Sequence, residues 1–228
     1  MLTLPERLLL ISIDDQGKPH DPKSSLGHAL AGAALTELLL AGQLRNDDDR
    51  VVATTAGPTG EALLDEVVAE IRGEKRPRTL KWWVKRLASR HRGRKPVRDR
   101  LIGQLTERGL LAGGERRVLG LVPVAAHRVA DPATAERARA AISEVLLGHQ
   151  EPDERAAALI ALVQVSGLVD ACVPAAERSE ARRRAGQIAA GNQVGEAVKR
   201  VQQEVMAAVT AAVVASSAAA SGAPSGSS

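Results

Sequence analysis

The chain has 228 residues, with 31 Lys or Arg, 27 Asp or Glu and a single cysteine. Its length and its hydrophobic fraction of 44% suit one large globular domain or two small ones. One cysteine excludes an intrachain disulfide and a cysteine-based zinc cage, and two tryptophans without Phe or Tyr exclude a base-stacking platform for single-stranded nucleic acid.

Helical periodicity dominates the first half of the chain and predicts a mainly α fold. Apolar residues recur every three or four positions in four segments. These segments predict helices over Leu26–Leu39, Leu63–Ile71, Leu80–Leu87 and Val97–Leu105. In the third segment the same spacing leaves Lys81, Lys85 and Arg86 facing outward.

The second half continues in helices. Asp131-Pro132, Pro152-Asp153 and Ser179 are plausible helix N-termini. Val205, Val209 and Val213 recur every four residues and predict a last helix packed in the core. Its apolar stretch is shorter than the ~20 residues that span a bilayer. Residues 217–228 are expected to form a flexible tail.

One pattern occurs twice: a helix, a glycine, a short strand, a polar turn and a second strand. The first copy places its turn at Asn46–Asp49. The second places its turn at Gly113–Glu115, ahead of a strand over Val118–Val122. A helix followed by a β-hairpin is also the local signature of a winged helix.

No catalytic or metal motif is found. The five histidines share no metal-ligand spacing, and the triplet Asp47–Asp49 suits a solvated turn better than a metal site. Gly57–Gly60 lacks the Gly-Lys-Ser/Thr of a phosphate-binding loop, and Cys172 among apolar residues suits a buried structural thiol. The sequence therefore predicts no enzyme, no cofactor and no metal site.

Positive charge is concentrated in one segment. Residues Arg72–Arg100 hold thirteen basic residues against two acidic ones, a formal charge of +11, while the whole chain carries +4. The remainder is therefore acidic, at −7. Such segregation predicts an anion-facing surface, with a solvated helix face as the alternative.

The end of this segment predicts an anion site. Pro96 suits the first position of a helix, which puts Lys95 at the cap and Arg98 in the first turn. Cations there oppose the helix dipole at ~0.3–1 kcal/mol each, unless a bound anion such as phosphate reverses the balance. Partial pairing with Asp99 and Glu107 is the alternative. The candidate residues, hereafter the cation cluster, are Arg90, Arg92, Arg94, Lys95 and Arg98.

Six segments resemble the Golgi phosphoprotein 3 family in order and spacing. They are residues 2–11, 32–44 and 58–66, the helix around Trp83, residues 97–111 and residues 204–209. The resemblance covers nearly the whole chain. It implies one Golgi phosphoprotein 3-like domain over residues 1–216, a single globular helical domain with a protruding β-hairpin.

The resemblance also implies a phosphatidylinositol 4-phosphate site on a basic surface. The Arg-x-x-Arg pair of the family's lipid pocket maps onto Lys95 and Arg98. Its Trp and its helix Arg map onto Pro22 and Ala31, which cannot supply the same contacts. The resemblance therefore implies an anionic head group without naming which one.

The family's hairpin tip maps onto residues 116–122. Its apolar residues Val118, Leu119 and Leu121 suit either membrane contact or contact between copies of the chain.

The leading hypothesis is a non-enzymatic adaptor on the cytoplasmic face of a membrane. Its expected partners are an anionic or phosphoinositide membrane, a membrane-protein client and further copies of the chain, but not nucleic acid. The alternatives are a winged-helix-like nucleic-acid-binding protein and a purely structural oligomer without lipid affinity.

Overall fold

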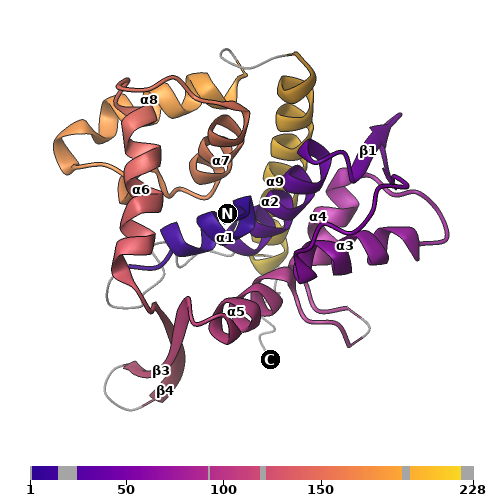
Figure 1. The fold of residues 1–228 in the computed structure, drawn as a ribbon, viewed down its shortest axis with the longest axis horizontal. Helices are drawn as coiled ribbons and strands as arrows, with labels where there is room; N and C mark the ends of the chain where they lie inside the picture. The colour runs from indigo at the N-terminus through magenta and orange to yellow at the C-terminus, as the bar shows by residue number, and fades with distance from the viewer. Residues whose placement is uncertain (1, 15–24, 92, 119–121, 192–195, 222–228) are drawn as a thin grey trace, which may run out of the picture.

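The computed structural model describes residues 2–14, 25–91, 93–118, 122–191 and 196–221. The first helices are α1 (Leu4–Ile11), α2 (Ser25–Leu40), α3 (Ala62–Arg72), α4 (Leu80–Ala88) and α5 (Val97–Glu107). The later ones are α6 (Pro132–Leu146), α7 (Glu154–Val165), α8 (Arg178–Ala189) and α9 (Glu196–Ser221), with 3-10 turns η1 (Val169–Ala171) and η2 (Ala175–Glu177). Two antiparallel hairpins join β1 (Leu44–Asp47) to β2 (Arg50–Ala53), and β3 (Leu111–Val118) to β4 (Val122–Val129). The predicted mainly α, single-domain fold with a protruding hairpin is confirmed (Figure 1).

Helix α2 is the centre of the core. Twelve of its sixteen residues are buried, and it contacts α1, α4, α7 and α9. Gly32 allows the closest of these approaches, because a Cβ built there would lie 2.5 Å from Cγ2 of Val209 and 3.3 Å from Cγ1 of Val205. Val205 and Val209 are themselves buried, as the four-residue spacing predicts.

A buried carboxylate ties three helices together at the end of α2. Glu37 is 7% exposed and accepts two hydrogen bonds from the guanidinium of Arg155 in α7, at 2.6 and 2.8 Å. It also accepts the backbone N–H of Leu4, in the first turn of α1, at 2.8 Å. These hydrogen bonds compensate the buried carboxylate for its lost hydration.

The first hairpin has the predicted turn. Asp48 and Asp49 occupy positive φ angles of 46° and 61°, which Asp tolerates better than most residues. The predicted acidic turn between two short strands is therefore confirmed at Asp48 and Asp49, whereas Asn46 and Asp47, which the prediction also placed in the turn, belong to β1.

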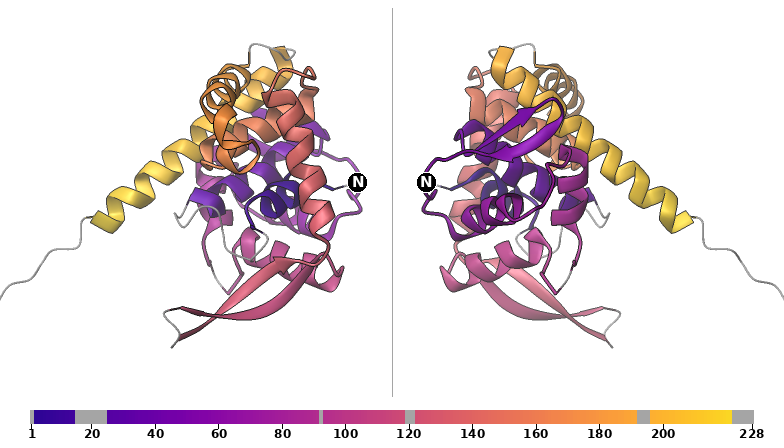
Figure 2. Two further views of the ribbon diagram at one scale, coloured as in Figure 1. Left: turned by 90° about the vertical axis from the view of Figure 1, so that its left-hand side faces the viewer. Right: turned by 90° about the vertical axis from the view of Figure 1, so that its right-hand side faces the viewer.

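In the second hairpin the predicted turn at Gly113–Glu115 is wrong. These residues lie within β3, where Gly113 pairs with His127 and Glu115 pairs with Ala125. The strands are connected instead by residues 119–121, outside the described residues. The ribbon of β3 and β4 extends away from the helices (Figures 1 and 2).

In the second half of the chain, the helices begin at or within one residue of the predicted N-termini. Asp131 and Asp153 cap α6 and α7, accepting the backbone N–H groups of Ala133 and Ala156 at 3.1 and 2.7 Å. Helix α8 begins at Arg178, one residue before the predicted Ser179. Helix α9 reaches Ser221, past the predicted domain boundary at 216, which stays a prediction.

Two smaller predictions concern the core and the membrane. Cys172 is buried, and burial raises the pKa of its thiol to about 12, as expected of a structural cysteine. In the part of the chain that the structure describes, the helices are too short or too polar to span a bilayer.

Candidate functional site

The basic segment begins on α4, whose amphipathic face fixes it to the core. Trp83 is 1% exposed and buried with Leu80, Val84 and Leu87. Thr79 starts the helix, its hydroxyl accepting the backbone N–H of Trp82 at 3.2 Å. The predicted outward cations Lys81 and Lys85 are exposed, whereas Arg86 is half-buried.

Arg86 is half-buried because it stacks on a tryptophan. The guanidinium carbons of Arg78 and Arg86 lie 5.0 and 5.2 Å from the ring centroid of Trp82, within cation–π range. The Trp82 ring meets that of Trp83 edge to face, at 4.9 Å between centroids. Two of the basic side chains are thereby ordered on the surface of α4 before any ligand binds.

A tight turn connects α4 to α5 and carries most of the cation cluster. The backbone N–H groups of His91 and Arg94 each donate to the other's carbonyl, at 3.2 and 2.9 Å, and Gly93 takes a φ of +81°. Arg90, Arg94 and Lys95 are exposed on this turn. Arg92 lies outside the described residues.

The start of α5 is shifted by one residue from the prediction. Pro96 is the N-cap and Val97 the first helical residue, so the prediction of Pro96 as the first residue and Lys95 as the cap is wrong. Val97 is fully buried and anchors the helix, which lets Pro96 precede it in an extended conformation. Among the described residues the N–H groups of Val97 and Arg98 have no acceptor, whereas those of Asp99 and Arg100 donate to the Pro96 carbonyl at 3.1 Å.

Carboxylates of α3 neutralise part of the basic segment. Glu70, with a side chain 6% exposed, forms ion pairs with Arg94 and with Arg100, each at 3.0 Å. Arg100 also pairs with Glu66 at 3.0 Å. The alternative pairing with Asp99 and Glu107 does not occur within the described residues; the counterions come from a different helix.

Three members of the cation cluster remain uncompensated. Arg90, Lys95 and Arg98 are exposed and form no ion pair with any described residue. They surround the N-terminus of α5, where the N–H group of the exposed Arg98 has no acceptor among the described residues. This arrangement can accept an anion through charge and backbone hydrogen bonds together.

Sequence reasoning missed Glu70 and the pairing of Trp82 with Arg78. The Glu66/Glu70 spacing of one helical turn signals a shared acidic stripe on α3, but not which cations it meets. The spacing of Trp82 and Arg86 likewise places these two residues on one face of α4, whereas Arg78 precedes the helix. That second signal could have been recognised.

The remaining positions implied by the resemblance lie elsewhere. Ala31 is fully buried inside α2, so this position faces the core, and Pro22 lies outside the described residues. Val118 ends β3 opposite Val122, while Leu119 and Leu121 are outside the described residues. The hairpin and the α4–α5 connection extend from the same lower side of the helices in Figures 1 and 2.

The acidic and histidine side chains are scattered rather than clustered. Among the described residues no three His, Cys, Asp or Glu side chains come close enough to hold a metal ion. The absence of a cofactor and of a metal stays a prediction.

Comparison with known proteins finds relatives of this chain. A family model described as Golgi phosphoprotein 3 (GPP34) matches residues 4–205. The vacuolar protein sorting-associated protein 74 of Eremothecium gossypii is 30% identical over 165 residues, which are 64% of this chain and 49% of that protein. The match thus spans about half the length of that relative, and neither description names an enzymatic activity.

Proposed function

The chain belongs to the Golgi phosphoprotein 3 family, and on that basis we propose that it is a non-enzymatic peripheral membrane protein that binds anionic lipid head groups. The ligand is phosphatidylinositol 4-phosphate or a related head group, and the site is the cation cluster. One observation carries the proposal: Arg90, Lys95 and Arg98 are exposed without a counterion among the described residues, beside the open N-terminus of α5.

The number of uncompensated cations suits reversible attachment. Each Lys or Arg near an anionic membrane contributes about 1 kcal/mol, so three contribute about 3 kcal/mol. Arg94, whose side chain is 57% exposed, can add to this if a phosphate competes with Glu70 for its guanidinium. The phosphate of a head group can also accept the N–H group of the exposed Arg98, which a diffuse surface charge does not require.

The position of the hairpin supports a membrane role. Because the β3–β4 hairpin and the α4–α5 connection extend from one side, both can meet a single plane (Figure 2). In this arrangement residues 118–121 contact either the lipid or another copy of the chain. The remaining surface is then free to hold a membrane-protein client, which is the adaptor role, on the cytoplasmic face of the membrane.

Co-sedimentation with vesicles tests the proposal. The vesicles are phosphatidylcholine alone, phosphatidylcholine with phosphatidylinositol 4-phosphate, and phosphatidylcholine with phosphatidylserine at equal surface charge. The double variant Lys95→Glu, Arg98→Glu changes the local charge by four units, and binding should fall by about a thousandfold at ~1 kcal/mol per charge. Unchanged binding by this variant would exclude the cation cluster as the site.

The matched control carries the same charge change elsewhere. Arg50 and Arg183 are exposed on β2 and α8, and Arg50→Glu with Arg183→Glu should leave vesicle binding nearly unchanged. A preference for phosphatidylinositol 4-phosphate over phosphatidylserine identifies a head-group site; equal binding to both identifies a charge-driven one.

Nucleic-acid binding is the second candidate, favoured by the +11 segment and the helix–hairpin pattern. In that role α5 would enter the major groove, yet Gly103, Thr106 and Glu107 on its exposed side offer little to base edges. Competition by duplex DNA at matched salt separates the two functions. Sequence-dependent displacement from vesicles would favour DNA.

A further inference from the structure

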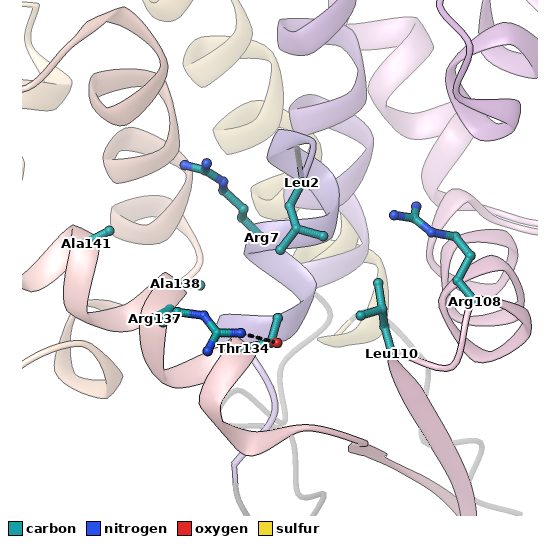
Figure 3. Close-up of a pocket in the computed structure, with 8 residues that line it drawn as sticks. All are labelled: Leu2, Arg7, Arg108, Leu110, Thr134, Arg137, Ala138 and Ala141. Carbon is teal, nitrogen blue, oxygen red and sulfur yellow. Dashed lines mark hydrogen bonds between the residues drawn. The ribbon is translucent and has the colours of Figure 1, made fainter.

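A second basic site lies at the opposite end of α5. A cavity of about 480 Å³ opens there between α1, α6 and the start of β3. Three guanidinium groups line it, Arg7 from α1, Arg108 from the end of α5 and Arg137 from α6, and no carboxylate does (Figure 3). Three arginines from distant parts of the sequence thus line one hollow.

The charge balance of this cavity is incomplete. Arg108 is paired with Glu6, a buried carboxylate that also accepts the backbone N–H of Thr3 at 2.7 Å. Arg137 donates to the Thr134 hydroxyl at 2.8 Å and lies 3.4 Å from Asp131. Arg7 is half-buried, and its side chain has no hydrogen-bond or ion-pair partner among the described residues.

A half-buried guanidinium without a counterion is costly, because it has lost part of its hydration without gaining a partner. Arg7 is therefore the group that a ligand would satisfy. One negative charge is enough, since the other two arginines already have carboxylates.

The rest of the lining is apolar. Leu2 and Leu110 stand on one side of the cavity, and Ala138 of α6 on another (Figure 3). Inorganic phosphate would leave these walls unused, whereas a short hydrocarbon chain would cover them. The volume lies within the usual range of small-molecule sites, roughly 300–1,000 Å³.

We propose that this cavity binds an anionic amphiphile, with its head group on Arg7 and its apolar chain against Leu2, Leu110 and Ala138. The site is distinct from the cation cluster. Helix α5 has eleven residues, so about 16 Å of helix separates its N-terminus from Arg108.

Isothermal titration calorimetry with inorganic phosphate and with n-butyl, n-hexyl and n-octyl phosphate tests the proposal. Each methylene that is buried should raise the affinity by up to about fourfold, because burial is worth ~0.8 kcal/mol per methylene. Inorganic phosphate should bind most weakly. Affinity that does not depend on chain length would overturn the amphiphile assignment.

Three variants locate the site. Arg7→Gln should lower octyl phosphate affinity about tenfold or more, since a charged hydrogen bond is lost, and Arg7→Lys should recover part of it. Ala138→Leu keeps every charge but fills the apolar wall, so it should flatten the dependence on chain length. If Arg7→Gln and Ala138→Leu both bind the alkyl phosphates as the unchanged protein does, the cavity is not the site.

Two controls separate this site from the lipid surface. Arg50→Gln removes an exposed arginine on the first hairpin and should leave octyl phosphate affinity unchanged. Lys95→Glu with Arg98→Glu should abolish vesicle binding but keep octyl phosphate binding. If that double variant loses octyl phosphate binding, the amphiphile binds at the cation cluster and the cavity proposal fails, whether or not vesicle binding is also lost.

Discussion

The end of α2 and the turn before α5 differ in how their charges are compensated. At the end of α2 a single carboxylate, Glu37, is buried and receives three hydrogen bonds from Arg155 and Leu4. Before α5, three exposed cations have no counterion within the described residues, and a helix N-terminus adds to their positive potential. The first region satisfies its charge inside the protein; the second leaves its charge for a ligand.

This difference separates stability from binding. Changes in the first region should reduce the free energy of unfolding and leave membrane affinity intact. Changes in the cation cluster should lower membrane affinity and should not reduce the free energy of unfolding, because removing like charges from a helix N-terminus relieves repulsion. A variant that alters both properties equally would break the separation.

Removing the buried carboxylate should have the largest effect on stability. Glu37→Ala strands the Arg155 guanidinium and the Leu4 N–H, which should cost about 3 kcal/mol, near the lower end for a buried pair because Arg155 is one-third exposed. For a domain of this size the melting temperature should fall by roughly 6–12 °C. Thermal unfolding followed by circular dichroism measures it.

The control for Glu37 is an exposed glutamate on another helix. Glu136→Ala on α6 should change the free energy of unfolding by no more than about 0.5 kcal/mol. The double variant Glu37→Ala, Arg155→Ala should be less destabilised than the two single variants summed, since neither charge is then left unpaired. Additive losses would mean that the pair does not stabilise the junction of α1, α2 and α7.

The next effect concerns the close approach of α2 and α9. Gly32→Ala places a methyl group 2.5 Å from Cγ2 of Val209 and should cost about 1–3 kcal/mol of overpacking. Gly186→Ala is the matched control, because Gly186 is exposed within α8 and a Cβ added there meets no atom within 4 Å, so alanine should stabilise by up to about 1 kcal/mol. Equal melting temperatures for the two variants would contradict the tight α2–α9 contact.

The sequence predicts helix α2 better than it predicts the interactions of the cation cluster. The long apolar run of α2 has no competing interpretation, and it predicts the helix to within a residue or two. Helix α1 is not among the predicted helices, although Pro5 stands in its first turn, where the missing N–H of proline costs no hydrogen bond. The Thr3 and Glu6 spacing of a capping box is the available signal.

For the cation cluster, sequence predicts the charges but not their partners. The density of Arg and Lys identifies the surface, yet only the packing of α3 beside the turn shows that Glu70 compensates Arg94 and Arg100. Three-dimensional proximity also creates the cavity of Arg7, Arg108 and Arg137, whose members are far apart in the chain. Local periodicity carries no information about such contacts.

Glu70 is a buried carboxylate that pairs with a member of the cation cluster. Its replacement should give the smallest change in vesicle affinity, and that change should be an increase. Glu70→Gln releases Arg94, whose side chain is 57% exposed, and adds one positive charge to the surface. Affinity for vesicles with phosphatidylinositol 4-phosphate should rise about fivefold, at ~1 kcal/mol per charge. Stability should fall slightly, because Arg100, 13% exposed, keeps only Glu66.

Comparing the co-sedimentation of Glu70→Gln and Glu180→Gln with vesicles decides whether the gain in affinity comes from the cation cluster. Glu180 on α8 pairs with Arg183, and its replacement adds the same charge far from the cation cluster. An equal gain in both variants would mean that overall charge, rather than the cation cluster, sets the affinity for the membrane. A gain in Glu70→Gln alone would show that an internal carboxylate limits how strongly this surface binds anions.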